Sequence, residues 1–127
     1  MVVGISILLD FSGVVDERFH CDQVWRDLIG RLIQMGGMKM LHLASHQFSS
    51  VKQKELADER NLQTGGTTAF ALLSESHISV HTWPEFKKVV IDIFTCGPTI
   101  RLDDMIEYLR EHIPHENLVV TRFERGE

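Results

Sequence analysis

Four adjacent polar residues, Ser74-Glu75-Ser76-His77, directly follow the apolar run Phe70–Leu73. If residues 77–83 form a strand, every second side chain points to the same face. The residues on that face are His77, Ser79, His81 and Trp83. Two imidazoles, a hydroxyl and an indole gathered there are able to bind a ligand or move protons. Because the exposed face of a sheet is often polar without a function, the spacing alone leaves both interpretations open.

Two familiar kinds of catalytic site do not match this segment. On a strand, His77 and His81 lie ~13 Å apart by the rise per residue, too far to share one metal ion. No cysteine or carboxylate nearby on the same face completes a ligand set. A Ser-His-Asp hydrolase of the common α/β type carries its serine in a G-x-S-x-G turn, and the sequence has none.

The segment 74–85, which reads SESHISVHTWPE, closely resembles the prokaryotic S-adenosylmethionine decarboxylase family, as does VIDIFTCG at 90–97. The resemblance extends more loosely to the N-terminal strand and helix, to His46-Gln47-Phe48, and to the last helix and strand. It implies a proenzyme that cleaves itself between Glu75 and Ser76 into fragments 1–75 and 76–127. It also implies a pyruvoyl group made from Ser76 as the cofactor, with no metal and no pyridoxal phosphate.

The chemistry explains why such a family needs a group of this kind. Loss of carbon dioxide from an α-amino acid leaves a carbanion, and a ketone that condenses with the substrate amine, forming a Schiff base, supplies an electron sink. No ordinary side chain is a ketone. In the scheme that the family implies, the Ser76 hydroxyl attacks the Glu75 carbonyl, and the resulting ester breaks when the Ser76 α-proton is removed.

The resemblance also implies roles for three residues around this bond. Thr68 stands where the family has the serine that stabilises the oxyanion during processing, eight residues before the nucleophile. His81 matches the histidine that accepts the α-proton. Cys96 matches the cysteine that reprotonates the carbanion after carbon dioxide has left.

Three more residues are implied as contacts for the substrate. Glu85 matches the glutamate that binds the ribose hydroxyls, because a carboxylate accepts two hydrogen bonds. Phe48 stands where an aromatic ring is expected against adenine, although a place in the core remains an equal alternative. Trp83 is either a wall of the same cleft or part of the core.

Three departures from the family pattern fall near the expected cleft. The segment after Phe48, residues 49–61, is longer than usual by roughly a dozen residues. Thr68 replaces serine, and Lys87-Lys88 stands where the family tends to have glycine and an aromatic residue. The expected reaction is decarboxylation of S-adenosylmethionine for spermidine synthesis, and a pyruvoyl-dependent arginine or ornithine decarboxylase on the same scaffold is the alternative. A homologue that never cleaves and acts as a regulatory or structural partner is a further alternative.

Hydrophobic periodicity predicts the elements that hold these residues. Alternation predicts strands at 3–11, 38–48, 67–73, 77–83, 88–96 and 118–123, and helical spacing predicts helices at 22–36 and between Pro98 and Pro114. The order is β-α-β-β-β-β-α-β. With only two helices, it predicts an α/β (α+β) fold, a two-layer sandwich in which both helices cover one face of a mostly antiparallel sheet. Residues 1–127 are expected to form a single domain.

The composition indicates which kinds of partner the protein is expected to bind. The net charge of −5 and the lack of a basic run argue against nucleic acid, and a mildly acidic protein suits a cationic small substrate. No apolar run approaches the ~20 residues of a membrane span and no secretory signal opens the chain, so a cytoplasmic location without membrane attachment is expected.

The two cysteines, Cys21 and Cys96, are far apart in the sequence and predict free thiols, with Cys21 structural. A small sheet has edges to protect, and the resemblance implies a homodimer of cleaved protomers.

Overall fold

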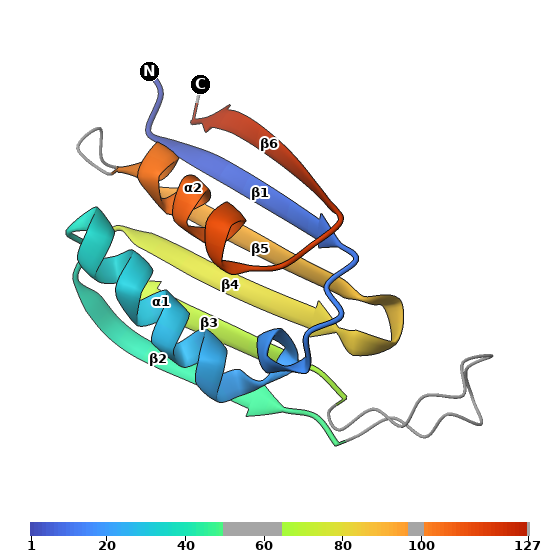
Figure 1. Ribbon diagram of the computed structural model, residues 1–127. Coiled ribbons are helices and arrows are strands. Elements are labelled where there is room, and N and C mark those ends of the chain that lie inside the picture. Colours follow the sequence, from blue (N-terminus) through green and yellow to red (C-terminus); the bar gives the residue numbers. More distant parts are fainter. Residues whose placement is uncertain (50–64, 97–100, 127) are drawn as a thin grey trace.

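A computed structural model of the protein describes residues 1–49, 65–96 and 101–126. Six strands form one sheet in the order β2-β3-β4-β5-β1-β6, in which every neighbouring pair is antiparallel (Figure 1). Their bounds are β1 Gly4–Ser12, β2 Met40–Gln47, β3 Thr67–Leu73, β4 Ser76–Trp83, β5 Lys88–Thr95 and β6 Asn117–Arg125. The predicted strands are confirmed, with ends that shift by up to two residues.

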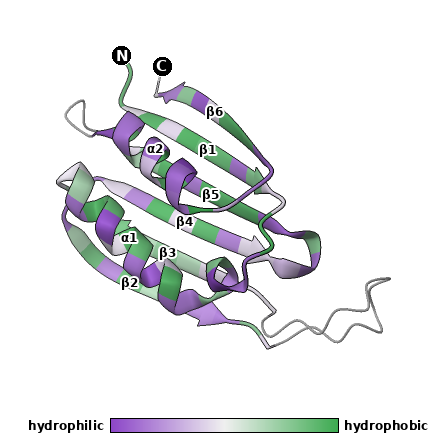
Figure 2. Ribbon diagram, viewed as in Figure 1, coloured by the Kyte–Doolittle hydropathy of each residue, from purple (hydrophilic) through white to green (hydrophobic). Residues whose placement is uncertain are grey.

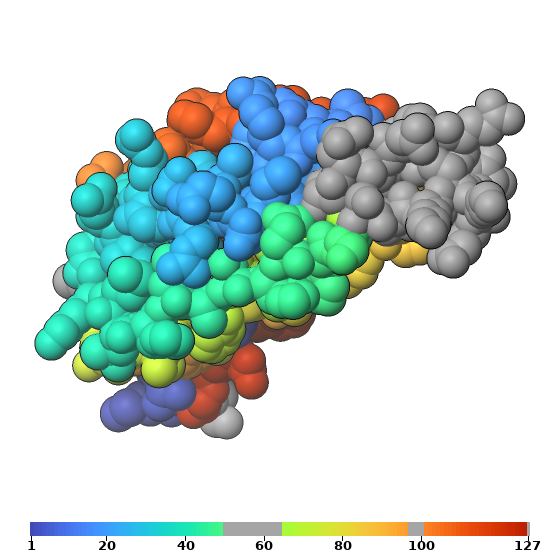
Figure 3. Space-filling model, turned by 90° about the horizontal axis from the view of Figure 1, so that it is seen from below, coloured from blue at the N-terminus to red at the C-terminus, as the bar shows by residue number. Residues whose placement is uncertain are grey.

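Two helices, α1 Asp22–Gly36 and α2 Leu102–His112, lie on one face of this sheet (Figure 1). Figure 3 looks onto the β2 edge, where α1 covers one side of the strand. Short 3₁₀ turns, η1 Glu17–His20 and η3 Pro84–Phe86, precede α1 and join β4 to β5. The predicted two-layer sandwich and its element order are therefore confirmed. Neither helix in the described part of the chain has the length and apolar character that crossing a bilayer requires.

The core forms where the periodic apolar residues of both layers meet. Figure 2 shows hydrophobic residues along much of β4, β5 and β1, three neighbouring strands in the interior of the sheet. Alternate residues of β1, namely Ile7, Leu9 and Phe11, are fully buried against the helices. The helix α1 contributes Trp25, Ile29 and Leu32 on one stripe. It ends where Gly37 takes a left-handed conformation with φ 65°, which glycine adopts without the steric cost of a side chain.

The other face of the sheet carries no helix in the described part of the chain, and we call it the open face. The strand alternation places His77, Ser79, His81 and Trp83 of β4 on this face, as the sequence predicts. It places Ser76, Ile78 and Val80 on the buried face, toward the helices. Ser76 and the histidines His77 and His81 therefore point to opposite sides of the same strand.

The longer segment that the sequence predicts at 49–61 lies outside the described residues except for Ser49.

Candidate active site

The bond predicted to break lies at the end of a tight hairpin. Strand β3 ends at Leu73 and β4 begins at Ser76, so that only Ser74 and Glu75 connect them. The backbone N–H of Ser74 donates to the Lys39 carbonyl at 3.0 Å, which fixes the turn against the start of β2. Glu75 is exposed, whereas the side chain of Ser76 turns inward and leaves the residue 9% exposed.

Two consecutive residues at the end of β5 contact this bond. Ser76 pairs with Thr95 in the antiparallel register, and the Ser76 hydroxyl donates to Thr95 Oγ1 at 3.0 Å. The next residue, Cys96, is exposed, and its thiol donates to the Glu75 carbonyl oxygen at 2.7 Å. The nucleophile and the carbonyl of the predicted cleavage site thus each have a hydrogen-bond partner on β5 or directly after it.

The second cysteine takes no part in this group. The Cys21 thiol donates to the Glu17 carbonyl at 3.3 Å at the start of α1. Burial raises the pKa of this thiol, and the nearby Glu17 carboxylate acts in the same direction. Both effects disfavour the thiolate, which fits the predicted structural role of Cys21.

A second group of predicted residues lies near the far end of β4. Thr68 pairs with His81 across β3 and β4, and Thr68 Oγ1 lies 3.2 Å from His81 Nδ1, within hydrogen-bond distance. The His81 ring also stacks on Trp83, with ring centroids 6.0 Å apart. Cross-strand neighbours on one face lie close together, so this pair follows from the shared face of the two residues and from the register of β3 against β4.

These residues line a pocket together with the predicted substrate contacts. Its wall includes Phe48, Thr68, His81, Trp83 and Glu85. Phe48 is 47% exposed and Trp83 is 38% exposed, so the alternative that either ring belongs to the core is wrong. The Phe48 ring instead meets the His46 ring edge-on, with centroids 4.7 Å apart.

Glu85 has a feature that is unusual for a structural carboxylate. Its Oε2 atom is buried and has no hydrogen-bond partner among the described residues. A buried polar atom without a partner is costly, and a hydroxyl from a ligand in the pocket would satisfy it. The geometry therefore fits the ribose contact that the family resemblance implies.

His20 lies close to Glu85, and the sequence reasoning did not single it out. Its Nε2 atom lies 2.8 Å from the Val14 carbonyl oxygen, and the residue is buried. Burial lowers the pKa of the His20 imidazole, while the Glu85 carboxylate acts in the opposite direction. A lone histidine in a short 3₁₀ turn gives no periodic signal, so only the packing of η1 against β4 brings it to attention.

The two groups lie far apart within one chain. Ser76 and His81 are five residues apart on an extended strand, a separation of ~16 Å at ~3.3 Å per residue. The structure thus brings together Glu75, Ser76 and Cys96 at one end of β4. It brings together Thr68, His81, Trp83, Glu85 and Phe48 at the other end.

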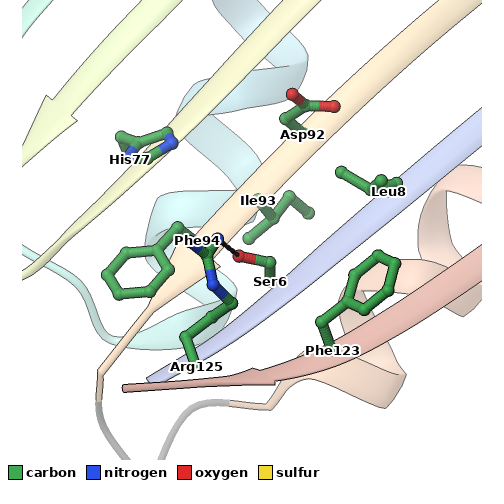
Figure 4. A pocket seen from close by; sticks show the side chains of 8 residues that line it. All are labelled: Ser6, Leu8, His77, Asp92, Ile93, Phe94, Phe123 and Arg125. Atoms are coloured by element: carbon green, nitrogen blue, oxygen red, sulfur yellow. Dashed lines mark hydrogen bonds between the residues drawn. The ribbon is translucent and has the colours of Figure 1, made fainter. Parts of the chain in front are cut away.

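His77 belongs to neither group. Its ring stacks between Phe70 and Phe94, each 5.7 Å away by ring centroids. It also lines a separate hollow on the open face, where Arg125 donates to Ser6 Oγ at 3.1 Å and Asp92 lies nearby (Figure 4). The stacked rings indicate that His77 packs the open face rather than serving either end of β4.

Comparison with known proteins agrees with the motifs. The family model described as S-adenosylmethionine decarboxylase matches residues 5–126. A protein of Methanococcus maripaludis (strain C5) named S-adenosylmethionine decarboxylase proenzyme is 43% identical over 124 residues, which cover 98% of this chain and 90% of that protein. A protein of the same name from Thermoplasma volcanium is 30% identical over 125 residues, covering 98% of this chain and 85% of that protein.

The fold has a solved counterpart. The crystal structure of the adenosylmethionine decarboxylase from Aquifex aeolicus matches with a TM-score of 0.79 and 24% identity, over 99% of this chain and 92% of that one. The likeness shows a common fold. The match of the family model to nearly the whole sequence, with the identity to these relatives, establishes that this chain belongs to the S-adenosylmethionine decarboxylase family.

Proposed function

We propose that this protein is a self-cleaving, pyruvoyl-dependent decarboxylase that acts on S-adenosylmethionine. Family membership supports the reaction class. The observation that carries the proposal is the contact at the predicted cleavage site, where the Cys96 thiol lies 2.7 Å from the Glu75 carbonyl oxygen. The resemblance assigns Glu75 to self-cleavage and Cys96 to the later reprotonation step, and the two residues meet there although they are 21 positions apart in the sequence.

In the proposed cleavage, the Ser76 hydroxyl oxygen forms a bond to the Glu75 carbonyl carbon. The peptide C–N bond then breaks, and the proton lost by the hydroxyl ends on the Ser76 nitrogen, leaving an ester. The thiol of Cys96 donates to the carbonyl oxygen, where negative charge develops during the attack. Removal of the Ser76 α-proton expels the Glu75 carboxylate and leaves dehydroalanine. Its imine tautomer reacts with water and releases ammonia, which gives the ketone.

The ketone at residue 76 supplies the electron sink that decarboxylation needs. The residues found here fit a group at that position, since Ser76 is buried at the start of β4 and Cys96 is the neighbouring exposed thiol. In the proposed enzyme, Cys96 holds a proton within reach of residue 76 and returns it to the substrate carbon.

The pocket at the other end of β4 favours S-adenosylmethionine over arginine or ornithine. The exposed rings of Phe48 and Trp83 offer faces for a purine base, and stacking of this kind contributes ~1–3 kcal/mol. The buried Oε2 of Glu85, which has no hydrogen-bond partner within residues 1–49, 65–96 and 101–126, offers an acceptor for a ribose hydroxyl. Arginine and ornithine contain neither a purine base nor a ribose. The proposed product is the aminopropyl donor for spermidine synthesis.

The separation of the two groups leads us to include a second copy of the chain in the proposal. Thr68 and His81 lie ~16 Å from Ser76 along β4, so they cannot reach the Ser76 α-proton of their own chain. In a dimer with two-fold symmetry, the His81 end of one chain meets the Ser76 end of its partner, and the same contact occurs twice. Each site then has its scissile bond from one chain and its pocket from the other.

The open face supports this assembly. It exposes the large apolar side chains Phe70, Leu72, Trp83, Val119 and Phe123. Apolar patches of this kind on a sheet mark an interaction surface, and pairing two open faces would bury them. The helices would then lie outside on both sides.

The substrate assignment is tested by carbon dioxide release. Carboxyl-labelled S-adenosylmethionine, arginine and ornithine are supplied in parallel to purified, cleaved protein. We expect release from S-adenosylmethionine at a rate at least ~100-fold above that from the other two, because they leave the purine and ribose contacts unused. Ser76→Ala protein is the matched control and should release none. Release from arginine or ornithine alone would contradict the substrate assignment, and no release from any of the three would contradict the enzymatic proposal.

A further inference from the structure

We infer that Thr95 is a positioning residue for self-cleavage, which orients the Ser76 hydroxyl for its attack on the Glu75 carbonyl. The inference rests on the proposed function, and it assigns to the chain a residue for which the motifs implied no role. Thr95 lies on the helix-facing side of β5, whereas Cys96 is exposed.

The contact is specific and enclosed. The Ser76 hydroxyl donates to Thr95 Oγ1 at 3.0 Å, and the two residues are partners in the β4–β5 register. Ser76 is 9% exposed and Thr95 is 1% exposed, so water has little access to this hydrogen bond. Thr95 is also held on its other side, where it pairs with Ile5 of β1. A threonine fixed between two strands has a well-defined rotamer and a fixed hydroxyl position.

The attack requires a particular arrangement of the serine. The reaction closes a five-membered ring made of the Ser76 Oγ, Cβ, Cα and N atoms and the Glu75 carbonyl carbon. Oγ must approach the carbonyl carbon with a lone pair, and its hydrogen must therefore point elsewhere. Accepting this hydrogen, Thr95 Oγ1 directs it toward β5 and leaves the Oγ lone pairs for the carbonyl carbon. Thr95 does not keep the proton, which ends on the Ser76 nitrogen when the ester forms.

A second interpretation of the same contact predicts the opposite effect on the rate of cleavage. A hydrogen bond that holds the hydroxyl in a resting rotamer would retard the attack, and its removal would accelerate cleavage. If Thr95 were purely structural, removal of its hydroxyl would change the stability of the fold but not the rate of the chemical step. The rate of cleavage therefore separates these cases from the positioning role.

The experiment follows cleavage of freshly made chains, synthesised in a cell-free system with a radioactive label and sampled over time on denaturing gels. Thr95→Val keeps the side-chain shape and removes the acceptor. We expect its cleavage to be about five- to tenfold slower than that of the wild type, the effect of one hydrogen bond on a barrier. Thr95→Ser keeps the acceptor and should cleave within about twofold of the wild-type rate.

Thr67→Val is the matched control. Thr67 is also 1% exposed, and its hydroxyl donates to the His46 carbonyl at 2.8 Å, so the variant loses one buried threonine hydrogen bond at the opposite end of β3–β4. We expect it to cleave at the wild-type rate. Equal rates for Thr95→Val and the wild type, faster cleavage of Thr95→Val, or equal slowing in Thr67→Val would each overturn the inference.

Hydroxylamine identifies the step that Thr95 affects, because it cuts esters and leaves peptide bonds intact. A His81→Ala chain should accumulate the ester and be cut on addition of hydroxylamine. A Thr95→Val chain should be cut no faster with hydroxylamine than without it, because the ester has not formed. Rapid cutting of Thr95→Val would place its defect after ester formation and refute the positioning role. A wild-type chain that never cleaves would instead refute the proposed function, so the two failures are distinguishable.

Discussion

Thr95 and Cys96 illustrate which part of the site can be predicted from single residues. The sequence predicts Cys96 through its motif, and the alternation of β5 places Thr95 on the opposite, helix-facing side. The contact between Thr95 and Ser76, however, depends on the register of β4 against β5. Register depends on the turn geometry as well as on the hydrophobic pattern, and a slip of two residues leaves every side chain on its face, so alternation alone does not fix the partners. The sequence does not predict His20 for a related reason: its position close to Glu85 arises only when η1 packs beside β4.

Lys87 is one of the departures from the family pattern, and its backbone conformation gives this departure a physical consequence. It lies between η3 and β5 in a left-handed conformation, with φ 56° and ψ 38°, where the family tends to have glycine. Side chains with a Cβ atom pay a steric cost in this region, and glycine does not. The backbone contacts of this residue, including donation from the Val14 N–H to the Lys87 carbonyl at 2.9 Å, do not need the side chain.

We therefore expect Lys87→Gly to stabilise the fold by about 0.5–1 kcal/mol, since the relieved strain exceeds the added flexibility of the unfolded chain. Urea unfolding in a Ser76→Ala background, where the chain stays intact, measures this free energy. Lys88→Gly is the matched control, because Lys88 begins β5 in an extended conformation and glycine should destabilise a strand. A Lys87→Gly midpoint at or below that of the Ser76→Ala parent would show that the left-handed turn is not strained.

Strand β4 is the element that organises the site, and its length has a clear consequence. Its eight residues separate the bond predicted to break, at Ser76, from the pocket at Trp83. The sequence predicts this strand and the face of each residue on it, because period-two alternation is a strong local signal. The sequence also predicts the distance between Ser76 and His81, since a rise of ~3.3 Å per residue places them ~16 Å apart. The predicted roles of the two residues agree with that separation only if another chain supplies one of them.

The strand order is less accessible from the sequence. Strand β1 comes first in the chain but lies between β5 and β6, which come last (Figure 1). No local pattern reports a pairing between residues so far apart. If the chain cuts itself as proposed, fragment 1–75 contributes β1 to a position between two strands of fragment 76–127. The two fragments should therefore remain in one folded molecule after cleavage and separate only when it is denatured.

The assembly of two chains is testable by complementation between inactive variants. Ser76→Ala and His81→Ala chains, carrying different tags, are each expected to remain uncleaved when expressed alone. When they are expressed together, a mixed dimer has one intact site, formed by Ser76 of the His81→Ala chain and His81 of its partner. We expect the His81→Ala chain, and only that chain, to be cleaved in the mixture, as followed by denaturing gels with tag-specific detection.

A double variant provides the control for this experiment. When Ser76→Ala is replaced by a chain that carries both substitutions, no site in the mixed dimer contains both residues, and no cleavage is expected. A mixture of the single variants in which neither chain is cleaved would mean that His81 does not act across the dimer. Cleavage of His81→Ala expressed alone would mean that this histidine is not needed for processing.

The intact mass of the purified, denatured wild-type protein tests the formation of the ketone at residue 76. We expect two species, residues 1–75 with an ordinary carboxyl end and residues 76–127 with a pyruvoyl group in place of the first serine. Reduction with borohydride should raise the mass of the second species by two hydrogen atoms, and Ser76→Ala should give only the full-length chain. A wild-type protein that stays at full length, or whose second fragment begins with an unchanged serine, would contradict the proposed chemistry.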